Sequence, residues 1–139
     1  ENPLASVRIE DDIAYIRIDV ADKEVNTLST AMTDRFDEIL DGLRHESGLE
    51  GAVLYSGKEG NFIAGFDIEE LKGFNEDPGE LRDLVERGHE QMREFEELDI
   101  PIVAAVDGTC LGGGLEVALA CHGRVAAETD ATTFGFPEI

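Results

Sequence analysis

Residues 108–116 read GTCLGGGLE, and this run constrains the fold more than any other segment of the chain. An apolar run at 102–106 precedes the three glycines, and a helix-forming run at 115–120 follows them. Glycine lets the chain turn where a Cβ would clash and lets a ligand approach the backbone. A strand that turns here into a helix leaves backbone N–H groups free at the positive end of the helix dipole. We therefore expect a site for a developing oxyanion, with Glu116 nearby as an acid or a base.

The composition is that of one acidic globular domain. The chain has 139 residues, 42% of them hydrophobic, which is enough for a core of its own. Eleven Lys and Arg against 32 Asp and Glu give a net charge of −21. This balance argues against binding to nucleic acid or to an anionic membrane, because both need a basic face. Two interpretations of the acidity stay open: a solvated surface adapted to high salt, or a docking surface for a basic partner.

Cys110 and Cys121 are the two cysteines, and both have apolar or small neighbours. A disulfide between them is not indicated, so we expect two buried thiols in a reducing compartment. The spacing of cysteines and histidines predicts no metal site. No segment approaches the roughly 20 apolar residues of a membrane span, and residues 1–4 lack a signal-peptide pattern. The expected location is therefore the cytoplasm.

Hydrophobic periodicity predicts alternating strands and helices in a single domain. We expect strands at 7–10, 13–19, 51–55, 102–106, 124–126 and 132–136. The first two alternate apolar and polar residues around a tight turn at Asp11 and Asp12, and so form a β-hairpin. The expected helices begin at Ser29 or Thr30 and end near His45, start at Asp67 as a short segment, and cover 81–98 and 115–120. Residues 58–65 and 73–79 are predicted as loops. This order favours an α/β stack of β-β-α turns in which each turn buries its apolar face on the next.

Two glycine-containing turns follow buried strands, one at 62–67 and one at 112–114. If neighbouring parallel strands carry them, their N–H groups converge at one edge of the sheet. Two N–H groups directed at one point form an oxyanion hole. Glu116 and Glu138 are the candidate acid–base pair, because two carboxyls near one site can divide the proton-transfer roles. A glutamate in so acidic a chain is usually a surface residue, but these two lie among glycines and apolar residues.

Six segments resemble, in order and spacing, the crotonase (enoyl-CoA hydratase/isomerase) superfamily. They are NTL at 26–28, FIAGFDI at 62–68, IPIVAAVDG at 100–108, LGGGLE at 111–116, ACHGRV at 120–125 and FGFPEI at 134–139. The NTL and ACHGRV versions are most similar to the hydratase domains of multifunctional fatty-acid oxidation complex α subunits. In those proteins a 3-hydroxyacyl-CoA dehydrogenase follows the hydratase.

The resemblance implies a fold and a set of site residues. Residues 1–139 would be the N-terminal core of a crotonase-type spiral of β-β-α turns without its C-terminal helices, and so a fragment of a longer chain. The amides of Phe66 and Gly113 would bind the thioester carbonyl, and Glu116 and Glu138 would be the catalytic glutamates. The residues implied to line the adenine end of the CoA site, largely through backbone atoms, are Ala64, Gly65, Asp67 and Ile68.

The implied reaction is hydration of trans-2-enoyl-CoA to 3-hydroxyacyl-CoA in β-oxidation, with acyl-CoA as substrate and no metal or redox cofactor. The resemblance also implies a trimer-based homo-oligomer and a fusion to the dehydrogenase. Two alternatives stay open: a Δ3-Δ2 enoyl-CoA isomerase and a catalytically silent acyl-CoA-binding fragment. Lys58 and Lys72 are the nearest cations for the CoA phosphates. His122 is expected to be structural, and the histidines at 45 and 89 to lie on helix surfaces.

Overall fold

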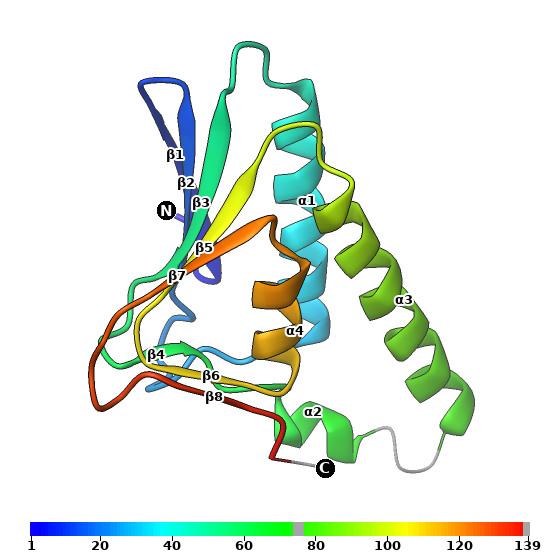
Figure 1. Ribbon diagram of the computed structural model, residues 1–139. Helices are drawn as coiled ribbons and strands as arrows, with labels where there is room; N and C mark the ends of the chain where they lie inside the picture. Colours follow the sequence, from blue (N-terminus) through cyan, green and yellow to red (C-terminus); the bar gives the residue numbers. More distant parts are fainter. Residues whose placement is uncertain (74–76, 138–139) are drawn as a thin grey trace.

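The computed structural model describes residues 1–73 and 77–137 and contains two sheets with helices beside them (Figure 1). In the larger sheet β1 pairs antiparallel with β2, and the remaining neighbours are parallel. Its strands, in spatial order, are β1 (Ala5–Glu10), β2 (Ile13–Ile18), β3 (Gly51–Ser56), β5 (Ile102–Val106) and β7 (Gly123–Ala126). The smaller, parallel sheet contains β4 (Asn61–Ile63), β6 (Thr109–Leu111) and β8 (Thr133–Gly135).

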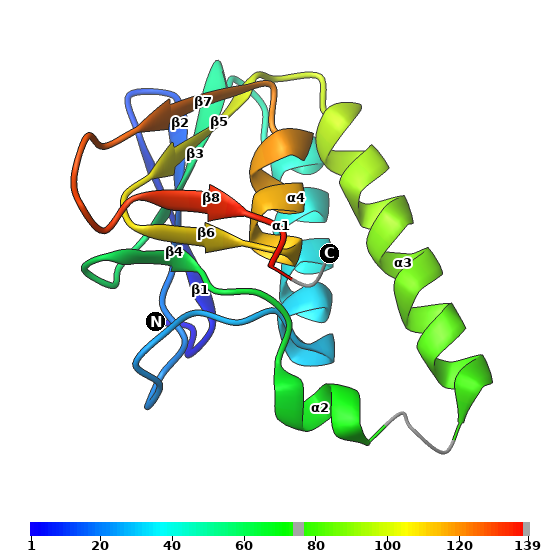
Figure 2. The same ribbon diagram turned by 60° about the horizontal axis from the view of Figure 1, so that its bottom comes forward.

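The chain passes repeatedly from the larger sheet to the smaller one. β3 is followed by β4, β5 by β6 and β7 by β8, so each pair forms one layer of a spiral (Figure 2). The helices α2 (Ile68–Lys72) and α4 (Gly113–Ala120) follow the first two pairs. The predicted α/β stack of β-β-α turns is therefore confirmed. The prediction of a loop over 58–65 was wrong, because it contains β4, and β6 was also missed.

Two long helices lie on one side of the strands in both views. α1 (Thr30–His45) begins where predicted, with the Ser29 hydroxyl accepting a hydrogen bond from the Met32 amide at 3.1 Å. α3 (Pro78–Glu96) begins three residues before the predicted start. The Asp77 carboxylate caps it, and proline suits the first helical position because its missing N–H needs no partner there.

Asn26, in the NTL segment, fixes the first glycine-containing turn to the larger sheet. Its side chain is fully buried and donates to the carbonyls of Ile18 at 3.2 Å and Phe62 at 3.0 Å. Its backbone carbonyl accepts from the Ala64 amide at 2.8 Å. Buried polar groups are retained only where they are hydrogen-bonded, so this side chain joins β2 to the end of β4.

The two cysteines are buried and unbridged, as predicted. Burial raises the pKa of Cys110 to about 11 and that of Cys121 to about 12. Both thiols are therefore protonated at neutral pH and are poor nucleophiles. Within the described ranges, no helix has both the length and the apolar character needed to cross a bilayer.

Candidate active site

The two glycine-containing turns leave neighbouring strands of the smaller sheet at the same end. β4 and β6 are parallel partners, with Asn61 opposite Thr109. β4 leads into residues 64–66, and β6 leads into residues 112–114. The predicted convergence of the two turns is therefore confirmed, although the strands that carry them are β4 and β6 rather than the longer strands named from the sequence.

The amides of Phe66 and Gly113 are left free by the hydrogen bonds around them. A single bridge joins Leu28 to this turn: its amide donates to the Gly65 carbonyl at 2.8 Å, and its carbonyl accepts from Asp67 at 2.7 Å. This pattern does not use the Phe66 N–H. The Gly113 N–H lies in the first turn of α4, where helical amides have no intrahelical acceptor. Within residues 1–73 and 77–137, neither amide has a protein acceptor.

The glycines of the second turn meet two steric requirements. Gly112 has a φ of +53°, in the left-handed region that favours glycine. A Cβ on Gly114 would lie 2.5 Å from the Ile63 carbonyl oxygen and 2.7 Å from the Ile63 Cβ. The start of α4 therefore packs directly against the backbone at the end of β4, which brings the two turns close together.

A cavity of about 530 Å³ lies against both turns. Six of the eight predicted site residues line it: Ala64, Gly65, Phe66, Ile68, Gly113 and Glu116. Asp67 is not one of its lining residues; the Asp67 carboxylate caps α2 and accepts from the amides of Glu69 at 2.9 Å and Glu70 at 3.2 Å. Glu138 lies outside the described residues.

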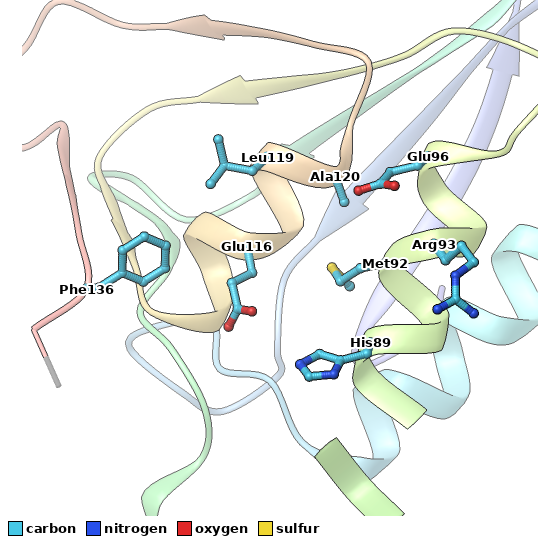
Figure 3. Close-up of a pocket in the computed structure, with 8 residues that line it drawn as sticks. All are labelled: His89, Met92, Arg93, Glu96, Glu116, Leu119, Ala120 and Phe136. Atoms are coloured by element: carbon cyan, nitrogen blue, oxygen red, sulfur yellow. The ribbon is translucent and has the colours of Figure 1, made fainter. Parts of the chain in front are cut away.

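A second cavity of about 510 Å³ adjoins the first and also contains Glu116 (Figure 3). Glu116 projects from the first turn of α4 and is exposed. His89 and Met92 of α3 also line both cavities, so these three side chains lie where the two cavities meet. An exposed carboxylate at this position is accessible to solvent water, which is a requirement for acid–base chemistry on water.

Sequence reasoning missed the wall of the first cavity that lies opposite the turns. It is apolar and comes from α2 and α3, with Leu71, Leu81, Leu84, Val85 and Met92 as lining residues. The apolar stripe of the segment 81–98 was the available signal, but it is also the signal of a helix packed on a core. His89 has an exposed side chain, as predicted, yet it faces these cavities rather than open solvent.

Lys58, named from the sequence as a cation for phosphates, has its ammonium group fully engaged elsewhere. Its three donors reach the carbonyls of Val20 at 2.8 Å and Lys23 at 2.6 Å and the carboxylate of Asp19 at 2.9 Å. The hydrogen bond from Lys58 lowers the pKa of Asp19. Lys72 is exposed and 3.6 Å from Glu69, so of the two candidates it is the one with an accessible charge.

His122 has the predicted structural role. Its Nδ1 accepts from the Ile102 amide at 3.0 Å, so the proton is on Nε2, which donates to the Glu96 carbonyl at 2.9 Å. The imidazole thus joins β5 to the end of α3. No three His, Cys, Asp or Glu side chains of the described ranges converge as metal ligands.

A family model described as enoyl-CoA hydratase/isomerase matches residues 8–139. The chain belongs to the enoyl-CoA hydratase/isomerase family. Its fold is that of the crotonases, as the resemblance implied. The free amides, the glycine-containing turns and Glu116 are thus features of a member of this family.

Curated relatives and solved structures agree with this membership. The fatty acid oxidation complex subunit alpha of Shewanella oneidensis is 43% identical over 132 residues, which is 95% of this chain and 19% of that protein. The subunit alpha of Vibrio vulnificus is 42% identical over 94% of the chain. The chain therefore spans about a fifth of the length of these relatives.

The enoyl-CoA hydratase of Bacillus anthracis superposes with a TM-score of 0.86 at 32% identity. A Geobacillus kaustophilus protein, described as an enoyl-CoA hydratase, reaches a TM-score of 0.92 at 26% identity. The chain covers 96% and 99% of its own length in these superpositions and 50% of each of the two solved chains.

Proposed function

We propose that this chain hydrates trans-2-enoyl-CoA to 3-hydroxyacyl-CoA, a step of fatty-acid oxidation. The observation that carries the proposal is the pair of free amides, Phe66 and Gly113, on two turns that border one cavity together with Glu116. The family match and the names of the relatives support an enoyl-CoA substrate.

In the proposed mechanism, the thioester oxygen accepts hydrogen bonds from the amides of Phe66 and Gly113. These bonds draw electrons toward the carbonyl, which makes C3 of the conjugated enoyl group electrophilic. They also stabilise the enolate that forms when water adds. Removing one donor of an oxyanion hole typically costs about 10²–10³ in rate. The partial positive charge at the start of α4 adds to the effect at Gly113.

Glu116 and Glu138 handle the water in this proposal. One glutamate, ionised, accepts a proton as the water oxygen bonds to C3, and the other, protonated, donates its proton to C2, so the elements of water add across the double bond. The exposure of Glu116 beside the cavity supports access to water. The apolar wall from α2 and α3 supports binding of the acyl chain, since it offers hydrocarbon surface opposite the turns.

Replacement of the glutamates tests this proposal. Glu138→Gln should lower the turnover of crotonyl-CoA hydration by about 10²–10⁴ and leave acyl-CoA binding largely intact, because only proton transfer is removed. Glu116→Gln should have a similar effect. The measurement is the loss of absorbance of the conjugated thioester, with calorimetry for acyl-CoA affinity. A near-wild-type rate in Glu138→Gln would contradict the proposal.

The matched control is Glu128→Gln, the same change at an exposed site, which should leave turnover unchanged. Assays of a 3-enoyl-CoA beside crotonyl-CoA separate hydration from the alternative isomerase activity. Calorimetric binding of acyl-CoA without either reaction would identify a silent binding module instead. The assays use the protein as the cell makes it, because the relatives are longer than this chain.

A further inference from the structure

His89 faces Glu116 across the gap between α3 and α4. The two helices pack against each other, and both residues line both cavities. Figure 3 shows the imidazole and the carboxylate directed into the same space from opposite sides. None of the motifs that point to the family includes His89, and sequence reasoning treated it as a surface residue.

The other charged groups in these cavities leave His89 as the basic partner for Glu116. The described titratable side chains that line them, besides these two, are Arg93 and Glu96, both from α3. Arg93 already pairs with Glu90 at 2.5 Å. The described lining residues from α1 and α2 are uncharged: Thr33 on α1, and Ile68 and Leu71 on α2.

The side chains of His89 and Glu116 share this space without a hydrogen bond between them in this structure. We propose that His89 is a positioning residue: when acyl-CoA binds, its ring N–H donates to the Glu116 carboxylate and holds it in the orientation that catalysis requires. An exposed glutamate on the first turn of a helix samples several rotamers. A charge-assisted hydrogen bond from imidazole to one carboxylate oxygen would select one of them and leave the second oxygen for the water. A misplacement of about 1 Å at a reacting group can cost on the order of 10² in rate. This inference rests on the proposed function.

The test compares His89→Leu with His89→Gln in crotonyl-CoA hydration. We expect His89→Leu to lower kcat by roughly ten- to a hundredfold with KM changed by less than about twofold, since the two amides and the apolar wall proposed to contact acyl-CoA remain. His89→Gln keeps an N–H donor and should recover most of the loss. His45→Leu is the matched control on α1, because His45 is exposed and lies outside both cavities.

A double-variant cycle shows whether His89 acts through Glu116. In a Glu116→Gln background, His89→Leu should reduce kcat no further. A rate for His89→Leu within about twofold of wild type, or an equal loss in the Glu116→Gln background, would overturn the positioning role alone. Absence of both hydration and isomerisation in the wild-type protein would overturn the proposed function, and the role of His89 with it.

Discussion

α1 and α3 have similar amphipathic sequences but meet different surroundings. α1 places Met32, Phe36 and Leu40 in the core, each almost fully buried. α3 buries Phe95 near its end, while Leu81 and Val85 in its first half remain 38% and 47% exposed beside the cavity. An apolar stripe therefore covers a core in one helix and the wall of a proposed binding site in the other. Exposed apolar side chains grouped at a cavity are the more informative case for function.

A leucine-to-alanine substitution on each helix should give the largest difference in the free energy of unfolding. Leu40→Ala on α1 removes a fully buried side chain and should lower the free energy of unfolding by about 2–5 kcal/mol. Leu81→Ala on α3 should change it by less than about 1 kcal/mol, because the side chain is 38% exposed. Urea denaturation of both variants measures the difference. Equal losses would mean that the first half of α3 is part of the core.

Removing the buried polar contact between α1 and α3 should have an intermediate effect on the free energy of unfolding. The Gln91 amide is buried and donates to the Thr33 carbonyl at 2.9 Å and to the Asp37 carboxylate at 2.7 Å. Gln91→Leu leaves the Thr33 carbonyl without this donor and should lower the free energy of unfolding by about 1–3 kcal/mol. Arg87→Gln, at the more exposed ion pair with Asp37, should cost less than about 1 kcal/mol. A larger loss of stability in Arg87→Gln than in Gln91→Leu would mean that the ion pair, and not the buried amide, is the stronger contact between the helices.

Polar substitutions in the apolar wall on α3 should have the smallest effect on the free energy of unfolding, but they should change which acyl-CoA substrates are preferred. In the doubly substituted Leu81→Ser, Val85→Ser protein, kcat/KM for a long trans-2-enoyl-CoA should fall roughly tenfold, as lost apolar contacts are worth about 0.8 kcal/mol per methylene. The rate with crotonyl-CoA, whose chain is short, should change little. Steady-state kinetics with both substrates checks this. Equal losses for the two substrates would exclude α3 as the wall that contacts the acyl chain.

Most of the fold follows from local sequence patterns. The β1–β2 hairpin was predicted because alternation flanks Asp11 and Asp12, which adopt φ values of 51° and 65° in the turn. α1 was predicted because a capping serine precedes a regular apolar spacing. β4 and β6 escaped detection because three residues are too few to show a period of two. Their strand conformation depends on pairing between segments distant in sequence.

For the candidate site, too, the sequence identified some residues and not others. The glycine-containing turns and Glu116 were identifiable because glycines after a strand and before a helix have few structural explanations. Asp67 was predicted to begin the short helix, and its carboxylate does cap α2. Its predicted contact with CoA is made mainly by backbone atoms and stays a prediction. The contribution of α3 was not predictable, because the way it packs against α1 and α4 decides which of its side chains line the cavity. Figure 1 shows α3 beside these two helices.

The central claim is that two free amides on neighbouring turns bind one thioester oxygen. A crystal structure of the protein with butyryl-CoA, a saturated thioester that has no double bond to hydrate, tests it directly. The account predicts the thioester carbonyl oxygen at about 2.7–3.1 Å from the backbone nitrogens of both Phe66 and Gly113. A carbonyl oxygen that is hydrogen-bonded to neither amide would contradict it.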